Sequence, residues 1–144
     1  MKTVMTHGTF DLLHYGHIAH LERCKTYGDY LIAGVTCDAA VAARKGDDRP
    51  IIPLEQRMVM VGSLKMVDKV VEIPYITSVF VDNLLSTIFS AQPDIFVTTY
   101  GAFSERISEF AAHNIKLVIV PEIRLTSTSD IIAKIRSSTP KAIK

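Results

Sequence analysis

The sequence predicts a single α/β domain in which a five-stranded parallel sheet carries helices on both faces. Five short runs of strand-forming residues alternate with helical patterns along the 144 residues. This alternation is typical of parallel sheets joined by right-handed crossovers. Several runs are continuous in Val, Ile and Leu, as expected of strands that are covered on both faces. A chain of this length buries a sizeable core, so residues 1–144 are expected to form one domain.

The expected strands and helices follow one another without a long linker. The strands are Thr3–Thr6, Tyr30–Thr36, Lys69–Ile73, Asp94–Val97 and Lys116–Val120. Helical patterns lie at about residues 17–27, 54–66, 79–91, 104–113 and 128–137. Gly28 suits the exit of the first helix, and Pro53 suits the first turn of the second. Ser127 and Asp130 have the spacing of a capping box before the last helix.

Composition excludes several classes of protein. With 48% hydrophobic and 22% charged residues, the chain is expected to be globular rather than disordered. The formal net charge of +1 gives no overall field that would attract nucleic acid or a membrane surface. No apolar run approaches the roughly 20 residues that a membrane-spanning helix needs. Cys24 and Cys37 form no C-x-x-C pair and nothing resembles a secretory signal, so a cytoplasmic protein with reduced thiols is expected.

The most informative segment runs from His7 to His17, where the first strand passes into the first helix. It reads H-G-T-F-D-L-L-H-Y-G-H, with a glycine between two histidines that are three residues apart. A glycine-containing turn at this junction leaves backbone N–H groups free at a helix N-terminus, where they attract phosphate. Imidazoles at the same place add donors that can follow charge onto a phosphate during a reaction. The alternative is that His14 and His17 only cap and pack the turn.

This G-T-F-D-x-x-H-x-G-H element resembles the signature of the nucleotidyltransferase superfamily that includes the small cytidylyltransferases. The chain contains neither G-x-G-x-x-G nor G-x-x-x-x-G-K-[ST], so no other nucleotide motif competes. The resemblance implies a Rossmann-like sheet with a nucleotide at its carboxyl edge. It implies that His14 and His17 are catalytic, holding the triphosphate and stabilising its developing charge. It also assigns part of the turn to nucleotide binding, namely Gly8, Thr9, Phe10, Asp11 and Gly16.

A basic segment after the second strand reads K-G-x-x-R-P-x-x-P-x-E-Q-R from Lys45 to Arg57. By itself, Lys45, Gly46 and Arg49 would form a mobile, solvated loop beside an exposed helix. Together with the histidine motif, the segment resembles the lysine loop and the E-x-R element of the same superfamily. The resemblance implies that Lys45 is a catalytic residue that reaches the nucleotide phosphates and that Arg57 helps to hold the triphosphate. Asp38, just before this segment, is expected to help organise the nucleotide site.

Three hydroxyl-bearing residues, Ser127, Thr128 and Ser129, precede the last helix. Capping of the helix would explain one of them, but three offer more donors than one helix end requires. The run S-T-S-D-I-I resembles the corresponding turn of choline-phosphate cytidylyltransferases. This resemblance implies that the three residues bind the β- and γ-phosphates with the help of the helix dipole.

Two segments depart from the superfamily pattern. The family usually has R-T-x-G before the hydroxyl-rich turn, whereas here the arginine, Arg124, is displaced by two positions and the glycine is absent. Arg124 is the candidate substitute at the phosphates. After the fourth strand the family tends to carry an acidic stretch near the acceptor and the base. This chain has Thr98–Gly101 there, so Thr98 is the candidate binding residue and the acceptor stays open.

The resemblance as a whole implies an enzyme that transfers CMP from CTP to a small phosphorylated or phosphonate acceptor and releases pyrophosphate. Acceptors of the glycerol 3-phosphate type or of the phosphoethanolamine and phosphocholine type would suit. Such a transfer depends mainly on positioning and charge neutralisation. Mg²⁺ is expected to arrive with the nucleotide rather than in a protein cage, with Asp11 as a candidate contact through the shell of the metal. No nucleic acid or membrane partner is expected.

Two alternatives and one assembly complete the sequence-based hypotheses. The segment from Lys45 to Met58 is also similar to heptose-1-phosphate adenylyltransferases, and the G-T-F-D-L-L-H start is shared with archaeal FMN adenylyltransferases, so ATP is the alternative nucleotide. The departure at Thr98–Gly101 leaves open a non-catalytic nucleotide-binding regulator. The resemblance also implies a homodimer that pairs beside the active-site edge, and the helix Leu54–Met66 is more apolar than one buried face requires.

Overall fold

The five expected strands lie in one sheet, and every neighbouring pair in it is parallel. The computed structural model describes residues 1–124 and 126–138. The strand order is β3–β2–β1–β4–β5, so β1 is central and the direction of winding reverses between β1 and β4. Such a reversal opens a crevice beyond the carboxyl ends of the two strands, where ligands bind in sheets of this kind. The strands are β1 (Thr3–Gly8), β2 (Tyr30–Thr36), β3 (Lys69–Ile73), β4 (Ile95–Thr98) and β5 (Lys116–Ile119).

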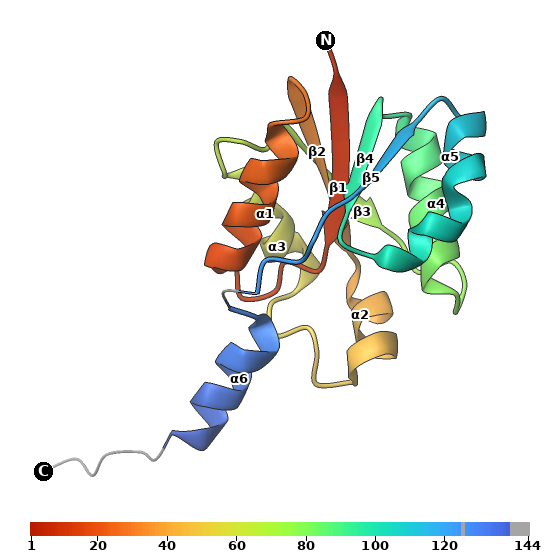
Figure 1. The fold of residues 1–144 in the computed structure, drawn as a ribbon. Helices are drawn as coiled ribbons and strands as arrows, with labels where there is room; N and C mark the ends of the chain where they lie inside the picture. The colour runs from red at the N-terminus through yellow and green to blue at the C-terminus, as the bar shows by residue number, and fades with distance from the viewer. Residues whose placement is uncertain (125, 139–144) are drawn as a thin grey trace, which may run out of the picture.

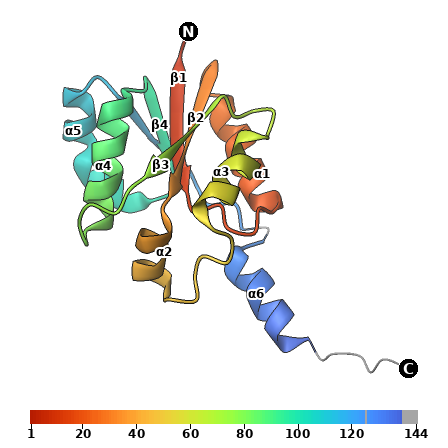
Figure 2. The same ribbon diagram turned by 180° about the vertical axis from the view of Figure 1, so that it is seen from behind.

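Helices cover both faces of the sheet, which confirms the predicted fold class (Figure 1, Figure 2). The pleat of β1 sends Val4 into a core shared with α1 and α3, and Met5 into a core shared with α4 and α5. Both side chains are fully buried, which explains the continuous apolar run in the sequence. The helices are α1 (Tyr15–Lys25), α2 (Asp38–Lys45), α3 (Leu54–Gly62), α4 (Phe80–Ala91), α5 (Ile107–Ala112) and α6 (Thr128–Ser137).

The segment directly after β2 is a helix that the sequence did not predict, whereas Gly46 and Arg49 lie in a loop as expected. This helix is α2, and the chain turns only at Gly46, whose φ is 105°. Its sequence D-A-A-V-A-A-R-K is rich in alanine, the strongest helix former. The buried face consists of Ala40 and Val41, which is too short a pattern for hydrophobic periodicity to reveal. Lys45 is therefore the last residue of a helix and not part of a mobile loop.

Other boundaries differ from the prediction by a few residues. The fourth helical pattern is divided, because Gly101–Arg106 forms a 3₁₀ helix (η1) ahead of α5. Pro53 is the residue that precedes α3, and Gly28 lies beyond the end of α1. A Cβ atom at Gly28 would lie 2.6 Å from Cγ2 of Val4, so glycine permits close packing against β1.

Helix α6 begins where the sequence places it. The hydroxyl of Ser127 accepts the N–H of Asp130 at 3.0 Å, which is the bond expected of the capping pattern. The helix then extends away from the carboxyl edge of the sheet in both ribbon views (Figure 1, Figure 2). None of the helices described by the structure is long and apolar enough to cross a membrane.

Candidate active site

A cleft of about 340 Å³ lies at the carboxyl edge of the sheet. Its walls come from segments that are far apart in the sequence: the start of α1, the end of α2, the segment after β4 and the first turn of α6. The fold thus brings together the histidine motif, the lysine and the hydroxyl-rich turn. The predicted site residues that line the cleft are His14, Gly16, His17, Lys45 and Ser127–Ser129.

The two histidines are stacked at the N-terminus of α1. Their ring centroids lie 3.7 Å apart and their planes differ by 22°. His14 Nδ1 accepts the N–H of Gly16 at 3.1 Å, and His17 Nδ1 accepts the N–H of His14 at 3.2 Å. Because a backbone N–H can only donate, the proton of each neutral ring lies on Nε2. Each ring therefore keeps one N–H donor for a ligand in the cleft.

The surroundings keep both rings neutral. Burial, with a smaller contribution from the neighbouring His14, His20 and Lys45, lowers the pKa of His17 to about 3. Burial also lowers the pKa of His14. Neutral rings can stack without repelling each other, and they remain donors to phosphate oxygens. Two fixed donors in a partly dry cleft can stabilise charge that develops on a phosphate.

The turn before α1 allows close approach of backbone segments. A Cβ atom at Gly16 would lie 2.9 Å from Cε1 of His14 and 3.2 Å from the carbonyl oxygen of Thr126. Glycine therefore lets the start of α1 approach the segment that leads into α6. Phe10 and Leu12 have φ values of 53° and 47°, a left-handed conformation that is unfavourable for bulky side chains. The fold thus holds this turn in a strained shape beside the cleft.

Asp11 connects three parts of the site instead of facing the cleft. Its Oδ2 and Oδ1 atoms accept the N–H groups of Ile51 and Ile52 at 2.7 and 2.9 Å. Its carbonyl oxygen accepts the hydroxyl of Thr128 at 2.7 Å. The residue is buried and both carboxylate oxygens are engaged. The structure therefore places Asp11 as a positioning residue and not at the shell of a metal.

The N-terminus of α6 forms the wall that carries the hydroxyl-rich turn. Ser127 Oγ is taken by the helix cap, whereas the N–H groups of Thr128 and Ser129 precede the first bond inside the helix. Arg49 lies beside this end, with Nη1 3.5 Å from Ser129 Oγ and Nε 3.8 Å from Asp11 Oδ2. Its side chain is only 10% exposed, and within residues 1–124 and 126–138 its Nε and Nη2 have no hydrogen-bond partner. Unmet buried donors are costly, so Arg49 is suited to bind an anion.

The structure places Arg57 differently from the sequence-based expectation. Its side chain is 0% exposed and its guanidinium donates to the carbonyl oxygens of Ile52, Thr9 and Thr36 at 2.7–2.8 Å. It also donates to Asp38 Oδ1 at 2.6 Å. Every nitrogen of the guanidinium is thus bonded to this chain, and the fully buried side chain does not line the cleft. Asp38, expected at the nucleotide, is the ion-pair partner of Arg57 and does not line the cleft.

Four other residues assigned to the nucleotide, Gly8, Thr9, Phe10 and Thr98, do not line the cleft. The carbonyl of Thr9 accepts from an arginine as described above, and Phe10 is buried. A Cβ atom at Gly8 would lie 2.9 Å from the Phe10 ring, so this glycine gives room to the turn. Thr98 is buried as well, and its Oγ1 lies 3.0 Å from Nε2 of His7. The neighbouring residue, Thr99, lines the cleft instead.

Arg124 is exposed and points away from the main cleft. It is 85% exposed and pairs with Glu122 at 3.2 Å. It borders a smaller hollow of about 240 Å³ that also touches Ser127. The structure thus gives Arg124 a place near the hydroxyl-rich turn but not on the cleft side of it.

Four residues contribute to the site although the sequence did not single them out as site residues: His20, Thr99, Glu122 and Arg49. The spacing of His14, His17 and His20 was a usable signal, since residues three apart share one face of a helix. His20 Nε2 lies 2.9 Å from Thr6 Oγ1, and burial lowers its pKa to about 4, with help from Arg23. No local pattern marks Arg49, because its burial depends on α6, which lies eighty positions later in the chain.

Comparisons with known proteins show the family to which this chain belongs. The sequence profile of the cytidylyltransferase-like family matches residues 5–139. The bifunctional protein HldE of Salmonella dublin is 37% identical over 143 residues, which are 97% of this chain and 29% of that protein. The HldE of Salmonella enteritidis has the same values. The chain therefore spans about three tenths of the length of the curated relatives it matches.

Solved structures give the same fold. The lipopolysaccharide core biosynthesis protein from Thermoplasma volcanium superposes with a TM-score of 0.66 and 28% identity, over 85% of this chain and 97% of that chain. Pantoate-beta-alanine ligase from Francisella tularensis superposes with a TM-score of 0.63 and 16% identity, over 94% of this chain and 69% of that one, a likeness of fold alone. Since the family profile covers nearly the whole sequence, the chain belongs to the cytidylyltransferase-like family of nucleotidyltransferases.

Proposed function

We propose that this protein transfers a nucleotidyl group from a nucleoside triphosphate to a small phosphorylated acceptor of the sugar phosphate type. ATP is the first candidate for the nucleotide. One observation carries the proposal. Two neutral Nε2–H donors, on His14 and His17, line the same cleft as the N-terminus of α6 with its hydroxyl groups. Helix N-termini and fixed N–H donors are both suited to phosphate oxygens, so a chain of phosphates fits between them.

In the proposed reaction an oxygen of the acceptor phosphate attacks the α-phosphorus of the nucleotide. The bond from the α-phosphorus to the bridging oxygen breaks, and pyrophosphate leaves with the electron pair of that bond. His14 and His17 donate to oxygens on which negative charge increases. The hydroxyl groups of Ser127 and Ser129 and the backbone N–H groups of Thr128 and Ser129 bind the leaving pyrophosphate, since the Thr128 hydroxyl donates to Asp11. Lys45 adds positive charge from the end of α2. No covalent intermediate with the protein is needed, because such a transfer depends on positioning and neutralisation.

The choice of nucleotide differs from the first expectation of the sequence. The segment from Lys45 to Met58 resembles heptose-1-phosphate adenylyltransferases, and the similarity to HldE proteins favours this alternative over CTP. ATP and a phosphorylated sugar are therefore the proposed substrates. CTP is the second candidate, because the matching family is described as cytidylyltransferase-like and the turn at Ser127–Ser129 resembles that of choline-phosphate enzymes.

The magnesium complex of the nucleotide is the proposed form of the substrate. In the described part of the chain, no group of three or more His, Cys, Asp or Glu side chains gathers in a way that could hold a metal ion. Asp11 uses both carboxylate oxygens for backbone N–H groups. The phosphates and water would then supply the oxygen ligands that Mg²⁺ prefers.

We place the protein in the cytoplasm as a homodimer. The two cysteines are free thiols in the structure, in keeping with a reducing compartment. The proposed interface involves α3, which exposes the apolar side chains of Val59 and Met60, and the resemblance to paired nucleotidyltransferases supports it.

Calorimetric titration with ATP–Mg²⁺ and CTP–Mg²⁺ tests the nucleotide. We expect tighter binding of ATP, and a clear preference for CTP would make the second candidate the better one. Pyrophosphate release across sugar phosphates, glycerol 3-phosphate and phosphocholine then tests the reaction. Nucleotide binding without pyrophosphate release from any acceptor would contradict the enzyme and support a non-catalytic regulator.

A further inference from the structure

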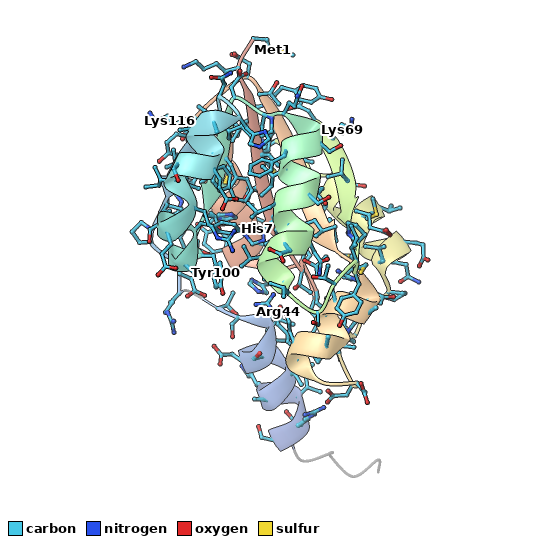
Figure 3. The ribbon with its side chains drawn as sticks, turned by 90° about the vertical axis from the view of Figure 1, so that its right-hand side faces the viewer. Met1, His7, Arg44, Lys69, Tyr100 and Lys116 are labelled. Carbon is cyan, nitrogen blue, oxygen red and sulfur yellow. The ribbon has the colours of Figure 1, made fainter. Side chains whose placement is uncertain are left out.

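A second cation, Arg44, lies at the end of α2 beside the cleft. Its guanidinium carbon is 3.8 Å from the centroid of the Phe80 ring, so the cation rests on an aromatic face. Its neighbour in the chain, Lys45, lines the cleft. Figure 3 shows His7, Arg44 and Tyr100 toward the end of the molecule that lies away from the N-terminus. Arg44 therefore lies next to the proposed phosphate site, and the proposed reaction does not use it.

Aromatic rings surround this cation and continue toward the sheet. The Phe80 ring lies 6.3 Å from that of Tyr100 and 6.2 Å from that of His7. His7 in turn is stacked on Phe96 at 5.6 Å. Burial, with a smaller contribution from the nearby His20 and Arg44, lowers the pKa of His7 to about 3, so His7 is uncharged. We call His7, Arg44, Phe80 and Tyr100 the Arg44 cluster, and Arg44 is its only charge.

The Arg44 cluster adjoins the cleft on two sides. Lys45 follows Arg44 at the end of α2, and Thr99 precedes Tyr100 after β4, and both Lys45 and Thr99 line the cleft. A molecule whose phosphate meets the nucleotide in the cleft can therefore extend toward the cluster. The cluster is thus placed to contact the acceptor and not the leaving pyrophosphate.

The charge of Arg44 is not neutralised by the described part of the protein. None of the ion pairs among the described residues involves Arg44. The segment Thr98–Gly101 beside it is uncharged, where the superfamily pattern has acidic residues. A quaternary ammonium group would need an open aromatic face or a carboxylate. Here the face of Phe80 is already covered by a cation, which would repel a second one.

We propose that Arg44, held on Phe80, selects the acceptor by its charge: it binds phosphomonoester dianions of hydroxylated molecules and rejects acceptors that carry an ammonium group. This assignment rests on the proposed function and adds to it the residue that determines specificity. The flat guanidinium keeps its edge free for two parallel hydrogen bonds to a phosphate, while its face lies on the ring. Tyr100 offers a hydroxyl group that can hydrogen-bond to hydroxyls of the same acceptor.

The test measures binding of acceptors to a complex that cannot react. The wild-type protein is first saturated with α,β-methylene ATP and Mg²⁺, and then titrated with a hexose 1-phosphate, glycerol 3-phosphate or phosphocholine. We expect whichever of hexose 1-phosphate and glycerol 3-phosphate binds more tightly to exceed the affinity of phosphocholine about tenfold or more. Arg44→Gln should weaken the binding of this preferred acceptor about tenfold or more and leave the affinity for the nucleotide analogue within about twofold. Arg44→Lys should restore only part of the loss, since it keeps the charge but not the planar fork.

Arg106→Gln is the matched control, because Arg106 pairs with Glu109 on the surface and lies outside the Arg44 cluster. It should change neither affinity. The assignment would be overturned if phosphocholine bound as tightly as hexose 1-phosphate and glycerol 3-phosphate, or if Arg44→Gln left the affinity for the preferred acceptor unchanged. Neither result would contradict the nucleotide site. The assignment would also be overturned if neither hexose 1-phosphate nor glycerol 3-phosphate bound to the saturated protein. If the wild-type protein does not bind the nucleotide analogue, the proposed function itself fails, and the assignment fails with it.

Discussion

The stacked histidines use their Nδ1 atoms for the fold and leave Nε2–H for the ligand. We therefore expect His17→Ala and His14→Ala to lower turnover by orders of magnitude, at ~3 kcal/mol or more in activation free energy for each. The loss of stability should be smaller, about 1 kcal/mol for His14, because it is the N-cap of α1. Steady-state kinetics and urea unfolding measure the two effects separately. His113→Ala is the control, since His113 stacks on Phe89, outside the cleft, and its loss should leave turnover unchanged.

Arg49 is the residue for which binding and stability should separate most clearly. Its buried guanidinium has two nitrogens without a hydrogen-bond partner in the described structure, so its removal relieves an unfavourable burial. We expect Arg49→Gln to weaken nucleotide binding about tenfold and to leave the free energy of unfolding unchanged or higher. Calorimetry and urea unfolding test this, with Arg136→Gln as the exposed control. A destabilised variant with full nucleotide affinity would make Arg49 a structural residue.

The buried histidines also predict how stability depends on pH. Burial lowers the pKa of His7 and His17 to about 3 and that of His20 to about 4, whereas the unfolded chain titrates near 6.5. Above pH 6.5 these groups are neutral in both states and do not affect the free energy of unfolding. Between pH 6.5 and about 4 only the unfolded chain binds protons, so stability falls as the pH falls.

The urea midpoint should therefore decrease from pH 7 to pH 5. Over this range the pH dependence of the free energy of unfolding should correspond to the uptake of nearly three protons on unfolding. Unfolding of a His20→Gln variant should take up about one proton fewer than unfolding of the wild-type protein. Stability that is constant over this range would contradict the neutral, buried state of these rings.

Among the elements, the connection made by Arg57 is the most sensitive point. Its guanidinium joins α3 to the turn after β1, to the end of β2 and to α2 through four hydrogen bonds. Arg57→Met should therefore destabilise the fold by about 3–5 kcal/mol, because it leaves several buried acceptors without a donor. Chemical denaturation measures the loss. Gln56→Ala, an exposed change on the same helix, should cost far less, and equal effects of the two would refute this role of Arg57.

The whole molecule leaves an apolar surface uncovered on α3. Val59 is 68% and Met60 is 40% exposed, while Arg57 and Val61 take the buried face of the helix. A homodimer would cover such a surface. We expect light scattering at micromolar concentration to give twice the chain mass, and Val59→Lys combined with Met60→Lys to give the monomer. A wild-type protein that is monomeric and active would contradict the dimer.

Local patterns in the sequence were sufficient for the architecture. The strands were found because continuous Val, Ile and Leu runs report burial on both faces, a property of each strand by itself. The turn around Gly16 and the cap at Ser127 were found because their chemistry depends on residues only a few positions apart. Helix α2 was missed since its buried face has only Ala40 and Val41. The sequence by itself thus determined the fold class, the edge of the sheet at which the cleft lies and the histidine and hydroxyl-bearing residues that line the cleft.

Only the tertiary structure decided which charged side chains face that cleft. Arg49 and Arg57 lie in one basic segment, yet the Arg57 guanidinium donates to four acceptors, three of them from distant elements. Arg49 lies beside α6, and its Nε and Nη2 have no hydrogen-bond partner among the residues that the structure describes. Asp11 was likewise expected near the metal but holds Ile51 and Ile52. The spacing of residues shows that a charge lies near the edge of the sheet. Which acceptor it meets, and whether it is desolvated, depends on segments that approach only after folding, and these long-range contacts decide its role.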